Sequence, residues 1–244
     1  MASRGQLFAL LKKSTTGDEV GRRLLDIGDL KSTHEFNMAA QALAAVRLFT
    51  RAIAMFAQME ASGFKPNTLS FNSAITACQG AGAWERALSL LEEMRSAGLA
   101  PDAVRYNAVL TTCGRAKQWG RAVELFEGME DAGVPPNAFH YSSVISACAK
   151  CGQADVAMRL FDQMPTKGIK PNAIVYNAAI SVCGNGGRTE RALSLLDEMR
   201  DAGVLPTVVS FTAVIAACGR RAGVSDGTRA LALLDEMLAA GLVP

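Results

Sequence analysis

Apolar residues recur along most of this chain at the spacing of helix faces. In residues 68–102, a first stripe with the spacing i, i+3, i+4, i+7 comprises Phe71, Ala74, Ile75 and Cys78. A second stripe with the same spacing comprises Ala87, Leu90, Leu91 and Met94. Such a spacing places the apolar side chains on one side of an α-helix. The pattern therefore predicts two amphipathic helices, joined by a short turn at Gly80-Ala81-Gly82.

The double stripe returns every 35 residues, and several residue types return with it. The recurring columns hold Cys78, Cys113, Cys148, Cys183 and Cys218; Met59, Met94, Met129, Met164 and Met199; Gly63, Gly98, Gly133, Gly168 and Gly203; and Pro66, Pro101, Pro136, Pro171 and Pro206. Gly suits the left-handed residue after a helix, and a Pro three residues later prevents the helix from continuing. Each second helix is therefore expected to end before this Gly and Pro.

We number the unit so that the recurring Pro is position 34. The units are then 33–67, 68–102, 103–137, 138–172, 173–207 and 208–244. The last unit has three extra residues near Val224 to Gly227 and stops at Pro244, which suggests part of a longer array. Because neither helix of a unit can bury its stripe alone, helix pairs must stack on one another. The sequence therefore predicts an all-α fold, an α-solenoid of stacked antiparallel helix pairs.

Residues 1–32 depart from this unit. Their apolar clusters predict two short helices, which we interpret as an N-terminal helical cap formed by a degenerate repeat. An organelle transit segment is the alternative, because Arg4, Lys12 and Lys13 precede the first acidic residue, Asp18.

Bulk composition gives no support to a nucleic-acid or membrane partner. The formal net charge is +2, so any binding of nucleic acid must depend on the local arrangement of side chains. Arg, Glu or Asp interrupts every apolar stretch that could span a bilayer, so we expect a soluble chain with no membrane partner.

Cysteine and histidine provide no catalytic or metal site. Five of the six cysteines occupy one column, on helices expected to stack about 8–10 Å apart. A disulfide needs Cα atoms within about 7 Å, so we expect buried free thiols. Cys148 and Cys151 form one CxxC with no second one to complete a zinc site, and His34 and His140 lie in different units. The sequence predicts no metal, no cofactor and no enzymatic activity.

Position 5 holds a small hydrogen-bonding side chain in all six units. These residues are Asn37, Asn72, Asn107, Ser142, Asn177 and Thr212. Asn is a poor residue for a helix interior, so its recurrence needs a reason. Local capping near the helix start is one interpretation. A row of donors and acceptors that address successive bases is the other.

Three further columns carry candidate functional residues. Position 35 holds Asn67, Asp102, Asn137, Asn172 and Thr207, which are all good N-cap residues. Position 2 holds Leu69, Val104, Phe139, Ile174 and Val209, which are either core residues or apolar wedges between which bases stack. Position 13 holds Arg115, Lys150 and Arg220, which either lie in a solvated turn or contact phosphates.

Over residues 33–244 the chain resembles the pentatricopeptide repeat proteins. The resemblance rests on the 35-residue period, Tyr or Phe before Asn at positions 4 and 5, Gly at 31, and Pro before Asn or Asp at 34 and 35. The constant repeat length resembles the P-type arrays of that family. The resemblance implies a right-handed superhelix that binds single-stranded RNA at one base per repeat. It also implies a monomer that acts in RNA processing, stability or translation in a mitochondrion or plastid.

In the family, positions 5 and 35 of one unit select the base together. Asn with Asp favours U, Asn with Asn favours a pyrimidine, and Ser or Thr with Asn favours A. The resemblance thus implies that Asn37/Asn67, Asn107/Asn137 and Asn177/Thr207 read a pyrimidine, Asn72/Asp102 reads U, Ser142/Asn172 reads A and Thr212 leans to a purine. The implied target is 5′-Y-U-Y-A-Y-R-3′.

A helical-repeat scaffold for protein–protein interaction is the alternative function, since a concave solenoid face suits either ligand. The tetratricopeptide repeats have that role, but their period is 34 residues and their residue pattern differs. A polar, electropositive surface around position 5 would favour RNA, and an apolar one would favour protein. Recruited protein partners are compatible with either function.

The implied code gives a direct prediction at the fourth base. Replacing Ser142 with Asn should change the preference there from A to a pyrimidine, by roughly tenfold, since one good base contact discriminates by about 1–3 kcal/mol. A binding selection from a randomised RNA pool measures the change. An unaltered preference for A would disprove the code at this repeat.

Overall fold

The computed structural model describes residues 4–220 and 224–243. In these residues we find fourteen helices and no strand. The helices are α1 (Arg4–Lys12), α2 (Gly17–Ile27), α3 (Thr33–Ala45), α4 (Phe49–Ala61), α5 (Thr68–Ala81), α6 (Trp84–Ser96), α7 (Ala103–Arg115), α8 (Trp119–Glu127), α9 (Ala138–Lys150), α10 (Ala154–Thr166), α11 (Ala173–Asn185), α12 (Thr189–Asp201), α13 (Val208–Arg220) and α14 (Val224–Ala239). No helix in the described residues is long and apolar enough to cross a membrane.

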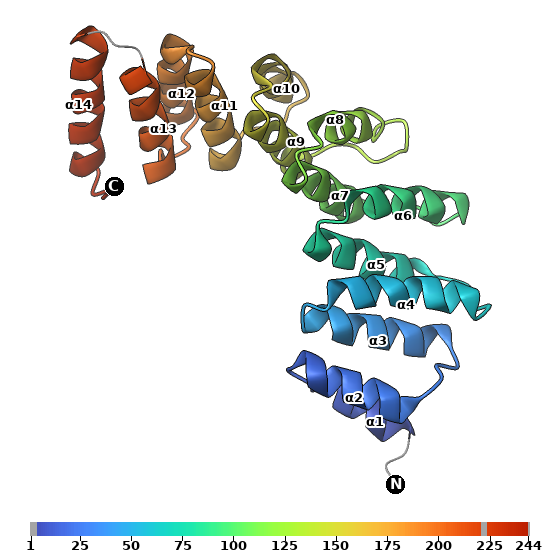
Figure 1. The fold of residues 1–244 in the computed structure, drawn as a ribbon. Coiled ribbons are helices and arrows are strands. Elements are labelled where there is room, and N and C mark those ends of the chain that lie inside the picture. Colours follow the sequence, from blue (N-terminus) through green and yellow to red (C-terminus); the bar gives the residue numbers. More distant parts are fainter. Residues whose placement is uncertain (1–3, 221–223, 244) are drawn as a thin grey trace. The chain divides into compact units, whose positions relative to one another are not determined.

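The helices form two compact parts, the N-terminal half (Met1–Ala116) and the C-terminal half (Lys117–Pro244). The first helices of the six units are α3, α5, α7, α9, α11 and α13, and each is followed by its second helix. Within each half, a first helix packs on the second helix of its own unit and on the next first helix (Figure 1). The α-solenoid fold class is thereby confirmed.

The predicted apolar stripes form the interior of each half. Phe71, Ala74, Ile75 and Cys78 are all buried, as are Ala87, Leu90, Leu91 and Met94. The aromatic residue at position 4 joins successive units, because it packs on a Phe of the preceding second helix. Ring centroids lie 5.0 Å apart for Phe56–Phe71 and 4.7 Å apart for Phe126–Tyr141. Such aromatic pairs contribute about 0.5–1.5 kcal/mol beyond their buried area.

The second helices end as predicted. The Gly at position 31 has a left-handed backbone in every unit, with φ between 71° and 80° at Gly63, Gly98, Gly133, Gly168, Gly203 and Gly241. Unexpectedly, Gly28 also has a φ of 69°, and Ser32 caps α3 through its side chain. These two residues lie 35 positions before Gly63 and Asn67, but the ψ of −145° at Gly28 lies outside the left-handed helical region, so only the N-cap of the repeat is kept there.

The turn between the two helices was predicted too early. Gly80 belongs to α5, and only Gly82 has the left-handed backbone, with a φ of 71°. The Phe49 ring lies over Gly80 at a distance that leaves no space for a Cβ atom, so Gly80 permits a close helix contact and does not form the turn. The left-handed residue is at position 15, where Arg47 and Lys117 take φ values of 63° and 59° in units without Gly.

One helix contact depends on the absence of a side chain. A Cβ atom at Gly184 of α11 would lie 2.8 Å from Cβ of Ala217 in α13, whereas one at Gly219, in the same column, would have no neighbour within 4 Å. Gly184→Ala should therefore reduce the free energy of unfolding by about 1–3 kcal/mol through overpacking. Gly219→Ala should be neutral or stabilising by up to about 1 kcal/mol, since Ala favours helix. Unfolding in denaturant measures the free energy of unfolding of both variants. If the two variants are equally stable, the close contact at Gly184 is refuted.

Candidate nucleic-acid interface

Column 35 provides the N-caps of the first helices, as predicted. Oδ1 of Asn67 accepts from the backbone N–H of Ser70 at 3.0 Å, and Oδ1 of Asn172 accepts from that of Val175 at 3.1 Å. Asp102 and Asn137 cap α7 and α9 in the same way. Such a cap typically contributes about 1 kcal/mol to helix stability. The cap also fixes these side chains at the start of each first helix.

Column 5 contacts column 35 of the same unit, thirty residues away. Nδ2 of Asn37 donates to Oδ1 of Asn67 at 3.3 Å. The hydroxyl of Ser142 donates to Oδ1 of Asn172 at 3.5 Å, and Nδ2 of Asn177 donates to Oγ1 of Thr207 at 3.4 Å. The two members of each of these pairs therefore form one polar site. Local capping is thus the wrong interpretation for Asn37, Ser142 and Asn177.

The remaining members of column 5 differ. The hydroxyl of Thr212 bonds to the carbonyl oxygen of Val208 at 2.8 Å, which is the local contact of the alternative interpretation. Oδ1 of Asn72 is buried and has no hydrogen-bond partner. Asn107 belongs to the N-terminal half and Asn137 to the C-terminal half, so their pairing stays a prediction.

Column 2 is not part of the core. Its five apolar side chains, Leu69, Val104, Phe139, Ile174 and Val209, are between 45 and 68 % exposed. Positions 2 and 5 are one helical turn apart and so lie on the same side of the first helix. In the second to sixth units, an exposed apolar side chain therefore lies beside the polar residue of column 5, whereas the first unit has His34 at position 2. The core interpretation of column 2 is wrong.

Column 13 presents basic side chains at the far end of the first helix. Arg115 is exposed, and its Nη1 donates to the carbonyl oxygen of Gln79 at 3.4 Å. Lys150 is also exposed. The side chain of Arg220 lies outside the described residues.

Column 3 of the following unit also belongs to this site, and sequence reasoning missed it. It holds Ser70, Arg105, His140, Val175 and Ser210. The hydroxyl of Ser70 donates to Oδ1 of Asn67 at 3.0 Å, and that of Ser210 donates to Oδ1 of Asn177 at 2.6 Å. Since an N3 side chain commonly reaches back to the N-cap residue, the spacing Asn67 to Ser70 was the available signal.

Acidic and basic residues are divided between the two kinds of helix. The first helices α5, α7, α9, α11 and α13 contain no Asp or Glu. Basic residues in them include Arg105, Arg115 and Lys150, and the acidic residues of these units lie mainly on second helices, as with Glu92 and Glu93 of α6. These five first helices therefore carry no acidic side chain, and α7, α9 and α13 carry basic ones.

The thiols behave as core residues. None of the six cysteines forms a disulfide, and Cys148 is buried whereas Cys151 is half-buried. Burial raises the pKa of the Cys78, Cys113 and Cys148 thiols to about 11. In the described residues, no cluster of His, Cys, Asp and Glu could hold a metal ion.

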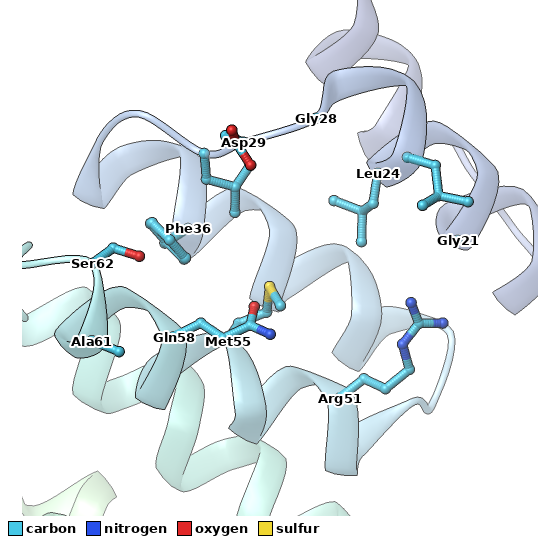
Figure 2. Close-up of a pocket in the computed structure, with 12 residues that line it drawn as sticks. Gly21, Leu24, Gly28, Asp29, Phe36, Arg51, Met55, Gln58, Ala61 and Ser62 are labelled. Carbon is cyan, nitrogen blue, oxygen red and sulfur yellow. The ribbon is translucent and has the colours of Figure 1, made fainter.

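Two pockets lie beside the N-terminal helix pair α1 and α2. Figure 2 shows the first, of about 540 Å³, which is lined by Leu24, Asp29 and Met55 among others. Asp29 is at position 32, where the other units have the apolar residues Phe64, Leu99, Val134, Ile169, Val204 and Leu242. The second, of about 520 Å³, lies between α1 and α3 and includes His34. The reading pairs in columns 5 and 35 line neither pocket.

Comparison with known protein families identifies the repeats. The family described as the pentacotripeptide-repeat region of PRORP matches residues 33–155 and 102–244. The chain belongs to the pentatricopeptide repeat family. The comparison with curated protein sequences gave no match.

Several solved structures share the fold. The pentatricopeptide repeat protein PPR10 from maize is 28 % identical, with a TM-score of 0.68 over 97 % of this chain and 34 % of that one. PPR10 in complex with an 18-nt psaJ RNA element is 27 % identical, with a TM-score of 0.70 over 99 % of this chain and 39 % of that one. The PPR domain of Arabidopsis thaliana protein-only RNase P 1, in complex with tRNA, is 20 % identical, with a TM-score of 0.60 over 68 % of this chain and 88 % of that one. The chain thus spans little more than a third of the PPR10 chain.

The thiol arrangement predicts selective alkylation. At pH 8 a thiol with a pKa of about 11 is roughly one part in a thousand thiolate, so the buried column should react slowly. We expect one fast-reacting thiol per native chain, Cys151, which Cys151→Ser removes. Counting labelled sites by mass spectrometry tests this, with all six expected to react in denaturant. Rapid labelling of any column thiol in the native chain would contradict it.

Proposed function

We propose that this protein binds single-stranded RNA in a sequence-selective manner along its first helices. In each unit, columns 5 and 35 face one base, and the exposed apolar residue of column 2 packs against its ring. Such stacking contributes about 1–3 kcal/mol per base and tolerates any base. The hydrogen-bonded pair then supplies the selectivity.

The observation that carries this proposal is the composition of the first-helix side. Isolated apolar side chains alternate there with polar pairs, and the helices α5, α7, α9, α11 and α13 contain no acidic residue. A polyanion is attracted to such a surface. A protein-binding groove would instead present a continuous apolar patch. RNA is therefore favoured over a protein ligand.

The similar structures support the same ligand. PPR10 is similar over almost the whole of this chain and has been solved in complex with an 18-nt psaJ RNA element. By this likeness, the chain reads about one base per repeat in the order 5′-Y-U-Y-A-Y-R-3′. It would act without catalysis of its own, by occupying RNA or by recruiting a partner protein.

The remaining parts of the proposal concern the chain as a whole. We place it as a monomer in a mitochondrion or plastid, following the family resemblance. We further propose that α1 and α2 cap the repeat array, which the burial of Phe8 and Leu11 beside Leu43 of α3 supports.

Removing one stacking side chain tests the function. Phe139→Ala should weaken binding of single-stranded RNA by roughly tenfold, because it removes one stacking contact. Leu205→Ala is the matched control, since Leu205 is also an exposed apolar residue, at 84 %, but lies outside the first helices. Fluorescence anisotropy at a stated salt concentration measures both variants, with unchanged melting temperatures expected.

Three ligands distinguish the candidate functions. We expect single-stranded RNA to bind more tightly than single-stranded DNA of the same sequence, and double-stranded RNA to bind weakly. Failure of the wild-type chain to bind any single-stranded RNA would refute the proposal. Equal losses in Phe139→Ala and Leu205→Ala would refute the role of column 2.

A further inference from the structure

The polar pairs of columns 5 and 35 differ in their surroundings, because the residue at position 3 of the following unit differs from one pair to the next. In the pair Asn177/Thr207, the fully buried Ser210 donates its hydroxyl to Oδ1 of Asn177 at 2.6 Å. The same hydroxyl oxygen accepts from the backbone N–H of Thr207 at 2.9 Å. The amide of Asn177 is therefore held with its oxygen toward Ser210 and its Nδ2 toward Thr207.

The equivalent residue of the second pair, Asn72/Asp102, is Arg105. Its Nη1 donates to both carboxylate oxygens of Asp102, at 3.2 Å and 3.0 Å. Oδ1 of Asn72, which corresponds to the oxygen that Ser210 holds in Asn177, is buried without any hydrogen-bond partner. Arg105 thus engages the acidic member of the pair and leaves the amide member without the hydroxyl donor that Ser210 provides.

We propose that Arg105 is a specificity-determining residue of the second reading pair. By holding the Asp102 carboxylate, it competes with the base for the acceptor that would distinguish uracil from cytosine. The two bases differ on their Watson–Crick edge, since N3 of uracil carries a proton that an acceptor can receive and N3 of cytosine does not. With the carboxylate paired to a guanidinium, this repeat accepts either pyrimidine. The inference rests on the proposed RNA-binding function and revises the second letter from U to Y.

Arg105→Ser tests the inference, because it copies Ser70 and Ser210 of the same column. The variant removes the guanidinium from the Asp102 carboxylate and leaves a hydroxyl that can donate to column 35, as Ser70 does to Asn67, or to column 5, as Ser210 does to Asn177. We expect the wild-type chain to bind RNAs with U or C at the second position about equally. The variant should prefer U by roughly tenfold, the discrimination of one good base contact.

Arg121→Ser is the matched control. Arg121 forms an ion pair with Glu124 at 2.8 Å in α8, with the same three-residue separation as Arg105 and Asp102. Its removal deletes one positive charge away from the columns and should leave the ratio of U to C affinities unchanged. The ratio at the fourth position, read by Ser142 and Asn172, should stay the same in both variants.

The outcomes separate this inference from the function beneath it. If neither the wild type nor Arg105→Ser binds single-stranded RNA, the proposed function fails. If both bind and share one ratio of U to C affinities, only the role of Arg105 fails. A wild-type chain that already prefers U tenfold would overturn the inference as well. Matching melting temperatures show that any change in the ratio does not come from unfolding.

Discussion

The first helices α5 and α11 begin at a side chain that both caps the helix and contacts column 5 of the preceding unit. Asn67 and Asn172 accept a backbone N–H of the helix they start and a hydrogen bond from column 5 of the unit they end. The cap is possible only because the left-handed Gly at position 31 ends the second helix four residues earlier. Helix termination, helix initiation and the geometry of the polar pair are thus coupled.

This coupling explains why the candidate interface is preformed within each half. The members of three polar pairs already bond to one another without RNA, so their side chains keep a defined orientation. A base that binds there meets groups whose rotamers are already restricted, which lowers the entropic cost of binding. The apolar residues of column 2 are exposed, so their side chains add little hydrophobic stabilisation to the fold. A ligand that covered them would bury this apolar surface on binding.

Column 3 shows how the stacking of units changes the surroundings of the polar pairs. Ser70 and Ser210 fit beneath their pairs because a hydroxyl is small enough to be buried and can both donate and accept. Arg105 is larger than Ser, and its charge is costly to bury. Its guanidinium therefore forms an ion pair with the carboxylate of Asp102. Two units with the same residues in columns 5 and 35 can therefore differ in the hydrogen bonds of that pair, since the residue at position 3 belongs to the next unit.

The sequence alone determined the period, the helix pairs, the caps and the buried thiol column, because these features follow from local propensity and from the spacing of apolar residues. The recurrence of Asn at position 5 also pointed to the polar pairs of columns 5 and 35. Tertiary structure decided the exposure of column 2, the extension of α5 beneath Phe49 and the partners of column 3. Those outcomes depend on which side chain of a neighbouring helix occupies a given space. Contacts between residues about thirty positions apart, such as Asn37 with Asn67 or Asn177 with Ser210, exist only once successive units have stacked.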